Sequence, residues 1–554
     1  MLAFDVVVLG GGGAGLRAAI EASKDSDLRL ALISKCMPLR STTGCTGGGM
    51  NAMLNLRGDD SLEIYYQDTM AGSAYLADRR AVQLYVESSA RNIRELQEYK
   101  NFFFRDKSGV LTQHRAPGGS AARICSTLAH SLAHSLHDKL NRCQVTQFFN
   151  THALRIVAEQ GRVAGLVVYD AIQGEILPVA CKSLIVATGG YGQVYWGNTT
   201  TPFGCTGDGI SLCMQLGIEF KDAEMVQFNP TGVAGSGTLL SDAARGAGAY
   251  LLNKHGERFM SKYDPQAMEK STRDKTALAI EQEIKLGNGV YGDNGEMGVV
   301  LDMRHLDRES FGGRLDSVYD KAQDFLGVDL SKETMLVRPA AHFSMGGIAI
   351  SDYRSCATAV GGIYAAGETA CVSVHGANRL GGNALGEVLT FGRLAGEYAA
   401  QYARDHSMQA AALCEYAQMW QEKFDYLGGR RSDKDISMIR KRLGEIMCEH
   451  LGIIRSVDSI DAALREIKDL QTEYHSLGVV DRELVMNTEF VQYTETGSML
   501  NIAEAIAVAA AARKESRGSH YRTDYPQTAE EHLQHTFVSS YDGQLKTDLR
   551  PPEV

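Results

Sequence analysis

The sequence predicts an α/β fold built on a Rossmann-like nucleotide-binding domain that an inserted domain interrupts. A buried-strand pattern at residues 4–9 runs into the glycine-rich turn Gly10–Gly15, and helical composition follows over 16–23. A second apolar run at 30–33 completes a βαβ unit of the length expected for dinucleotide folds. The pattern stops near residue 225 and returns at a short apolar strand within 361–367, so the intervening residues are expected to form a separate domain.

The other elements follow from composition along the chain. Helical patterns cover 61–100 and 119–140, and strand patterns cover 163–169 and 183–187. Residues 225–340 are more polar and show little strand alternation, and a helix after the returning strand is expected to end near 404. Residues 409–512 predict charged helices with no strand candidate; Ile502–Ala512 among them predicts a buried helix. Residues 513–554 form a polar tail.

Charge and composition exclude several classes of protein. Lys and Arg number 56 against 67 Asp and Glu, and a net charge of −11 argues against sequence-independent nucleic-acid binding. A hydrophobic content of 44% excludes a disordered chain. No window of about 20 residues is free of charge and apolar enough to span a bilayer. The first residues lack the basic region of an export signal, so none is expected.

The eleven cysteines and the clustered histidines predict no metal site. No two cysteines form a Cys-x-x-Cys pair, which argues against zinc-ribbon and ferredoxin-type sites. Free thiols in a reducing cytoplasm are expected instead. His130, His134 and His137 have helical spacing but no carboxylate at a suitable offset, and are predicted to form a helix face.

The strongest local signal is Gly10-x-Gly12-x-x-Gly15 between the first strand and helix. Gly10 suits the tight turn, Gly12 lets the backbone approach a pyrophosphate, and Gly15 lets the helix pack against the strand. The acidic ribose ligand of ordinary NAD enzymes would follow about 20 residues later. Ser34 and Lys35 stand there instead, so this motif alone leaves the dinucleotide open.

Further motifs settle the resemblance. At Thr206–Gly209, Gly367–Glu368 and His375–Leu385 the sequence resembles the flavoprotein subunit of succinate dehydrogenases and fumarate reductases. The resemblance covers nearly the whole chain. It extends over the ordered segments Lys35–Thr43, Gln227–Gly232, Arg245–Met260, Ser271–Asp274, His342–Ile348 and Arg513–Tyr521.

The resemblance implies a domain order and a cofactor. Residues 1–224 and 341–406 would form the FAD-binding domain, 225–340 an α+β capping domain, 407–512 a helical domain and 513–554 a C-terminal extension. A substrate would bind between the flavin and the cap, where closure excludes water. The implied FAD contacts are Gly10, Gly12, Gly13, Ala14, Gly15, Ser34, Lys35, Ser41, Thr42, Thr43, Gly47, Gly48, Gly49, Asp208, Glu368, Arg379, Ala384 and Leu385.

Several positions depart from the family pattern. The histidine that carries the covalent flavin bond in quinone-linked members is Thr42 here, and threonine has no nitrogen to form that bond. FAD is therefore predicted to bind without a covalent link. A common glutamine is Gly47, the substrate-binding histidine of one segment is Asn229, and the Thr-Glu pair of the cap is Ser241-Asp242. The usual Arg-Gly-Glu-Gly has become Arg245–Gly248, with alanine at 247.

The resemblance also implies roles for the remaining site residues. His342 and Arg379 would take one carboxylate of a C4 dicarboxylate, and Ser241 and Asn229 the other. Phe103 aligns with a phenylalanine that packs on the substrate. Flavin N5 would give a hydride to one alkene carbon and the arginine matched by Arg273 a proton to the other. Asp242 and Arg245, one helix turn apart, would relay protons to Arg273.

Three functions remain open at this point. The first is a fumarate reductase or succinate dehydrogenase flavoprotein in the cytoplasm, held at the inner face of the membrane through partners. It would exchange electrons with an iron–sulfur subunit, and with a further quinone- or thiol-linked subunit. Losing the flavin link is expected to lower the flavin potential and favour fumarate reduction. The second is an L-aspartate oxidase-like enzyme, and the third is a flavin-binding electron-transfer scaffold without a substrate. A reductase of a different unsaturated dicarboxylate also stays open.

Overall fold

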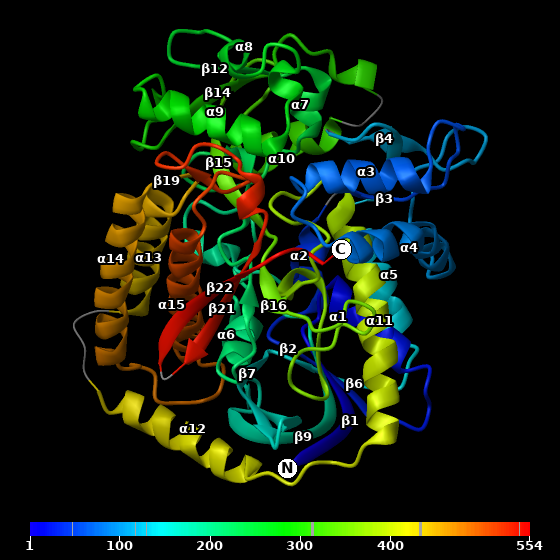
Figure 1. The fold of residues 1–554 in the computed structure, drawn as a ribbon, viewed down its shortest axis with the longest axis vertical. Coiled ribbons are helices and arrows are strands. Elements are labelled where there is room, and N and C mark those ends of the chain that lie inside the picture. The colour runs from blue at the N-terminus through cyan, green and yellow to red at the C-terminus, as the bar shows by residue number, and fades with distance from the viewer. Residues whose placement is uncertain are drawn as a thin grey trace.

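A computed structural model describes the whole chain except residues 47, 117, 129, 312–314, 431–434, 542 and 554, and leaves out the side chains of 310 and 311. One lobe carries the first sheet and the long helix α11, a second lobe stands above it, and a bundle of helices lies alongside (Figure 1). The N-terminus lies at the bottom of the view, in the first lobe, and the C-terminus lies near the centre. This arrangement brings segments from the whole sequence around one centre.

The first lobe is built on a seven-stranded sheet that begins with the predicted βαβ unit. β1 (Leu2–Leu9) and β2 (Leu30–Ser34) pair in parallel, and α1 (Gly13–Ala22) connects them. The strand order is β6-β2-β1-β9-β8-β7, and β17 pairs with β9. The other bounds are Val145–Phe149 for β6, Thr151–Glu159 for β7, Arg162–Asp170 for β8, Glu175–Val186 for β9 and Ile363–Ala365 for β17.

The pairing of β17 shows that the chain returns to its first sheet after the insert. β17 is parallel to β9, with Tyr364 opposite Ile185, although about 180 residues separate them. α11 (Asn383–Asp405) then packs along α1, and the predicted helix end near 404 is confirmed. Gly392 and Gly396 permit this close approach, because a Cβ at either would lie within 2.7 Å of the α1 backbone.

Helices and a small sheet cover the sheet edge beside the glycine turn. The predicted helical stretch 61–100 contains two helices, α3 and α4. The prediction of a helix over 119–140 is wrong in its first half, because Ala122–Ser126 forms strand β5 between β3 and β4. The bounds are Thr42–Cys45 for α2, Leu62–Gly72 for α3, Arg79–Glu98 for α4, Ser131–Leu140 for α5, Asp208–Met214 for α6, Gly49–Asn51 for β3 and Gln113–Arg115 for β4.

The upper lobe holds a sheet of its own, which the sequence did not reveal as alternation. Its strand order is β11-β15-β14-β12, with β13 beside β14, and its apolar core runs from Val233 to Val337, separate from the main core. The strands are Val226–Val233 (β11), Tyr250–Leu252 (β12), Val290–Tyr291 (β13), Met297–Asp302 (β14) and Met335–Ser344 (β15). The helices are Ala243–Ala247 (α7), Met260–Tyr263 (α8), Arg273–Lys285 (α9) and Asp316–Leu326 (α10).

Three helices form the lateral bundle, with bounds Ile436–His450 (α13), Val457–Ser476 (α14) and Thr488–Ala512 (α15), whereas α12 (Leu413–Gly428) lies beneath them and packs against β8 and β9 (Figure 1). The predicted buried helix at Ile502–Ala512 is the second half of α15, and most of its residues are buried. The expectation of no strand is wrong at one point, because Ile454–Arg455 (β19) pairs with Tyr521–Arg522 (β20). In the part of the chain that the structure describes, no helix has the length and hydropathy needed to cross a bilayer.

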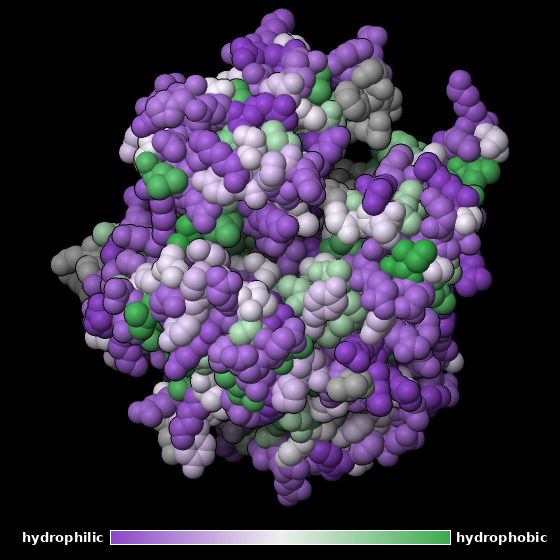
Figure 2. Space-filling model, turned by 45° about the horizontal axis from the view of Figure 1, so that its top comes forward, coloured by the Kyte–Doolittle hydropathy of each residue, from purple (hydrophilic) through white to green (hydrophobic). Residues whose placement is uncertain are grey.

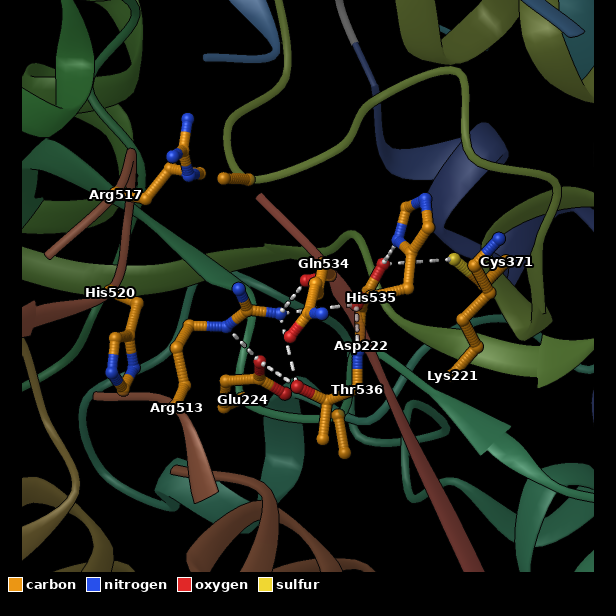
Figure 3. Close-up of polar contacts among 12 residues, drawn as sticks. Lys221, Asp222, Glu224, Cys371, Arg513, Arg517, His520, Gln534, His535 and Thr536 are labelled. Atoms are coloured by element: carbon orange, nitrogen blue, oxygen red, sulfur yellow. Dashed lines mark hydrogen bonds and ion pairs between the residues drawn. The ribbon is translucent and has the colours of Figure 1, made fainter. Parts of the chain in front are cut away.

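The polar tail is not an unstructured end. β21 (His535–Tyr541) and β22 (Gln544–Arg550) form a hairpin that extends the sheet of β18 (Ala370–Cys371), β16 (Gly347–Ala349) and β10 (Phe220–Lys221). Buried charges fix it in place (Figure 3). Arg513 donates to Glu224 Oε1 at 2.5 Å and to Thr536 Oγ1 at 3.0 Å, and His535 Nδ1 lies 2.6 Å from Asp222 Oδ2. Through these buried contacts the C-terminal residues pack into the folded domain. Removing one charged partner would leave the other buried and unpaired, which is strongly destabilising.

Candidate active site

One large cavity of about 2930 Å³ lies where the first lobe, the upper lobe and the helical bundle meet. A hollow opens beneath the upper lobe (Figure 2), and the cavity wall combines charged and hydroxyl side chains with apolar ones. The cavity wall contains all the predicted site residues that the structure describes except Gly15 and Phe103. These are Gly10, Gly12, Gly13, Ala14, Ser34, Lys35, Ser41, Thr42, Thr43, Gly48, Gly49, Asp208, Asn229, Ser241, Asp242, Arg245, Arg273, His342, Glu368, Arg379, Ala384 and Leu385.

Three predictions need separate comment. Gly47 lies outside the described residues. Gly15 has a packing role, since a Cβ there would lie 1.9 Å from the carbonyl oxygen of Gly10. Phe103 is only 5% exposed and belongs to the main apolar core, whereas its neighbour Phe104 lines the cavity. The structure therefore does not bring Phe103 to the cavity.

The turn between β1 and α1 requires glycine for steric reasons. Gly10 has φ +118°, and a Cβ there would lie 2.2 Å from the carbonyl oxygen of Ala187. Gly12 is different, because nothing closer than 3.8 Å would meet a Cβ and the residue lines the cavity. The backbone is thus open to a ligand at Gly12, where the first N–H groups of α1 have no partner within the helix.

Hydroxyl side chains hold the glycine turn in shape. Ser34 Oγ accepts from the N–H of Gly11 at 3.1 Å, and Thr43 Oγ1 accepts from the N–H of Gly13 at 3.0 Å. Ser34 ends β2, at the position where ordinary NAD enzymes carry an acidic residue that binds the ribose. The turn, the helix N-terminus and the size of the cavity fit a dinucleotide such as FAD.

The charge of Lys35 is paired with carboxylates in the cavity wall. Its Nζ donates to Asp208 Oδ2 at 2.6 Å, to Glu495 Oε1 at 2.8 Å and to Thr206 Oγ1 at 2.6 Å. Burial alone would lower the pKa of Lys35, but the two carboxylates raise it above its ordinary value. Lys35 and Asp208 therefore tie the segment after β2 to α6 and α15, which gives both residues a structural role at the dinucleotide site.

Thr42 is the residue predicted to stand in place of a flavin-linking histidine. It begins α2, and its Oγ1 lies 3.2 Å from Cys205 Sγ. Both residues line the cavity, and burial raises the pKa of Cys205 to about 12. The thiol is thus protonated at neutral pH and is a poor nucleophile. Neither side chain offers a reactive nitrogen or thiolate at this point.

A chain of charged side chains lies on the cap side of the cavity. Arg273, at the start of α9, donates through Nε to Asp242 Oδ2 at 2.7 Å. Arg245 donates through Nη2 to Asp242 Oδ1, also at 2.7 Å. Burial would raise the pKa of Asp242, but the two guanidinium groups hold it well below its usual range. Although an aspartate is one methylene shorter than a glutamate, Asp242 contacts both arginines. It stays ionised at any physiological pH.

Gln227 is a site residue to which the sequence analysis gave no role. Its Oε1 accepts from Arg273 Nη1 at 3.1 Å and from Arg379 Nη2 at 3.0 Å. Its Nε2 donates to Asn378 Oδ1 at 2.8 Å, so the amide is held at both ends. The available signal was its place in the segment Gln227–Gly232, which carries part of the resemblance.

Arg379 and His342 complete the polar end of the cavity. Burial and the nearby Arg273 lower the pKa of Arg379 to about 9, so the group remains charged at neutral pH. Burial and both arginines lower the pKa of His342 well below its ordinary value, which leaves the ring neutral. His342 Nδ1 lies 2.7 Å from Thr200 Oγ1. When that hydroxyl donates, the proton of the imidazole resides on Nε2, which can then donate to an anion.

Asn229 and Ser241 also line the cavity. Asn229 Oδ1 accepts from the N–H of Thr231 at 3.0 Å, which orients the amide, and Nδ2 is the donor that it can offer a substrate. Ser241 Oγ accepts from the N–H of Ala243 at 3.3 Å and keeps its own proton to donate. Together with the arginines, these groups form a set of donors around one region.

The charges in this set suit a dianion. Arg245, Arg273 and Arg379 carry three positive charges against the one negative charge of Asp242, a net charge of about two positive units. A dicarboxylate would neutralise it and accept hydrogen bonds from both sides. Within the described residues, no group of three or more metal-ligating side chains occurs.

Comparison with known proteins gives matches along almost the whole chain. Residues 5–385 match the family model described as "FAD binding domain", and residues 440–554 match "Fumarate reductase flavoprotein C-term". The chain is 38% identical to the 8-methylmenaquinol:fumarate reductase flavoprotein subunit of Wolinella succinogenes, over 94% of this chain and 86% of that one. It is 34% identical to the succinate dehydrogenase flavoprotein subunit of Rickettsia bellii, over 99% and 95%.

The fold matches solved structures equally well. A variant FrdA chain of the quinol fumarate reductase of Escherichia coli superposes with a TM-score of 0.95 at 32% identity, over 100% of this chain and 98% of that one. The predicted fold class, an FAD-binding domain with capping and helical parts, is confirmed by this match.

Proposed function

Because the chain belongs to the flavoprotein family of fumarate reductases and succinate dehydrogenases and is an FAD-dependent oxidoreductase, we propose that it reduces fumarate to succinate, reversibly. The observation that carries the proposal is the contact chain Arg245–Asp242–Arg273–Gln227–Arg379, whose four charged members line the cavity. It offers a dianion two anchoring ends and a proton donor between them. Relatives named as reductases and as dehydrogenases both occur, so the direction rests on the flavin attachment argued below.

Substrate binding in this proposal uses donors at both ends of a C4 dicarboxylate. Arg379 and His342 Nε2 donate to one carboxylate, and Asn229 Nδ2 and Ser241 Oγ donate to the other. The neutral ring of His342 contributes a hydrogen bond without adding charge. Changes at Asn229 and Ser241 leave room for a substituted dicarboxylate, which is the nearest alternative substrate within the same chemistry.

Proton delivery falls to Arg273. When bound, FAD supplies the two electrons as a hydride. Arg273 would then protonate the neighbouring carbon. The ionised Asp242 would pass it a proton from Arg245, and solvent would replace the proton that Arg245 gives up. An arginine is a weak acid in water, so its use as the donor depends on resupply of the proton through its contact with Asp242, which also contacts Arg245.

Electrons would enter through an iron–sulfur subunit, with a quinone- or thiol-linked subunit beyond it. Two similar proteins are named as subunits of fumarate reductase or succinate dehydrogenase, which supports partner subunits for this chain. Attachment to the inner face of a membrane would then come from those partners. Copurification with a tagged chain, followed by iron analysis, tests this part of the proposal.

FAD is expected to bind without a covalent link, because Thr42 and the protonated Cys205 offer no suitable nucleophile. Acid precipitation of the holoprotein should therefore release all the flavin into the supernatant. The measurement is flavin absorbance in pellet and supernatant. A fluorescent protein band on a denaturing gel would contradict the prediction.

Loss of Gln227 should disturb the two arginines without removing them. In Gln227→Met, a side chain of similar volume, Arg273 and Arg379 lose their shared acceptor. We expect kcat/KM for fumarate to fall about 10- to 100-fold, in line with one or two hydrogen bonds to charged groups. FAD content should be unchanged. Gln418→Met, on the exposed face of α12, is the matched control, and equal kinetics in both variants would show that Gln227 does not position the arginines.

A further inference from the structure

A second, much smaller cavity lies next to the large one. Its volume is about 10 Å³, close to the space that one water molecule requires. Four of the eleven residues that line it are Phe343, Glu368, His375 and Glu387. Phe343 and Glu368 also line the large cavity, so these two side chains form the partition between the two spaces.

The polar groups around the small cavity lack protein partners. Both ring nitrogens of His375 and both carboxylate oxygens of Glu387 are without a hydrogen bond among the described residues. His375 is 6% exposed and Glu387 2% exposed. Burying such groups without a hydrogen bond costs several kcal/mol, of order 1–3 per group. A water in the small cavity would give one nitrogen of His375 and one oxygen of Glu387 a partner, since buried waters bind two to four polar groups.

Glu368 connects this group to the dinucleotide site. Its Oε1 accepts from the N–H of Ser344 at 2.9 Å. Gly190 makes room for the carboxylate, because a Cβ there would lie 2.3 Å from Oε1. A charge on Glu368 therefore faces the large cavity directly, whereas Glu387, on the first turns of α11, reaches it only through Glu368 and the small cavity.

The acidities of the two carboxyls lie near neutral pH. Burial raises the pKa of Glu368 to about 7, and burial together with the nearby Glu368 raises that of Glu387 to about 8. Arg379 opposes both shifts. Burial lowers the pKa of His375 well below its ordinary value, so the ring is neutral. The remaining titratable groups that face the pair are neutral at pH 7, because burial raises their pKa values: Tyr85, Tyr191, Cys205 and Cys356.

We propose that Glu368, backed by Glu387, His375 and a water in the small cavity, is a proton-binding site coupled to the redox state of the flavin. The inference rests on the proposed function for the presence of FAD. Reduction places two electrons and one proton on the flavin ring, a gain of one negative charge. A second proton, drawn from solvent, then binds the Glu368 carboxylate and cancels that charge. The electrons come from the external donor, and no other bond is made or broken.

The test is the flavin midpoint potential as a function of pH. For a two-electron couple, each proton taken up shifts the potential by about 30 mV per pH unit. In the oxidised holoprotein Glu368 is half ionised near pH 7 and mostly ionised above about pH 7.5, so between about pH 7.5 and 8.5 the wild-type slope should approach about 60 mV per pH unit. Glu368→Gln should show about 30 mV. Glu397→Gln, an exposed position on α11 paired with Arg393, is the control and should keep the wild-type slope.

A wild-type slope of one proton, or an unchanged slope in Glu368→Gln, would overturn the inference. If Glu368→Gln does not retain FAD, infrared difference spectra of the unmodified holoprotein decide the matter. Reduction should add one protonated-carboxyl band that shifts in D₂O, and it should perturb a second band that Glu387→Gln removes. If the first band does not appear on reduction, the inference is overturned. Failure of the chain to bind any FAD is a separate outcome, and it would contradict the proposed function instead.

Discussion

Arg273→Gln is expected to lower the turnover of fumarate by about 10³-fold, within the usual range for loss of a general acid. The glutamine cannot donate a proton and take it back from Asp242, although it can keep a hydrogen bond to Gln227. FAD content should stay normal, because Arg273 lies at the start of α9 in the cap and contacts Asp242 and Gln227. Steady-state rates with a reduced dye, normalised to bound flavin, measure the effect.

The matched control is Arg304→Gln. Arg304 lies in the same lobe, is half exposed and pairs with Asp302 outside the cavity. This variant should retain wild-type turnover. Near-normal fumarate reduction by Arg273→Gln would show that another group supplies the proton.

Arg379→Gln is expected to raise the KM for fumarate about 100-fold, with a smaller effect on kcat. Loss of one partner from a buried charge pair costs about 2–5 kcal/mol, which brackets this change. Arg379→Lys keeps the charge but not the planar fork, so it should recover only part of the affinity. Flavin content is measured first in each variant, because Arg379 also lines the dinucleotide part of the cavity.

An exposed arginine of α11, Arg404, provides the control for this series. Arg404→Gln should leave KM unchanged. A wild-type KM in Arg379→Gln would remove Arg379 from the substrate site and leave His342 as the main ligand of that carboxylate.

The parts of the fold that could be predicted are those with a local steric cause. Gly10 and Gly15 have no alternative residue at their positions, since a Cβ would meet backbone within about 2.2 Å. The turn, β1 and α1 therefore follow from sequence alone. The strands of the upper lobe and the hairpin β21–β22 could not be predicted this way. Their pairing with distant segments, such as β10 with β21, supplies the stability that the local pattern lacks.

The site shows the same division. Arg273, Asp242, His342 and Arg379, each of which stands in a recognisable segment, line one cavity. Phe103 does not line it. Three phenylalanines occupy 102–104 in an extended stretch, so alternate rings face opposite sides. The outer two are more than 40% exposed and the middle one is buried in the core. Gln227 was missed because its role comes from two arginines that are distant in sequence.

The most direct test of the proposed function is to measure both directions of the reaction with the purified holoprotein. Fumarate reduction is followed with a reduced low-potential dye, and succinate oxidation with a matched acceptor. Because the flavin lacks its histidyl link in this proposal, its potential should be low and reduction should be the faster direction. We expect one succinate for every two electrons consumed. Succinate oxidation as fast as fumarate reduction, or oxaloacetate formed from aspartate with no succinate, would contradict the account.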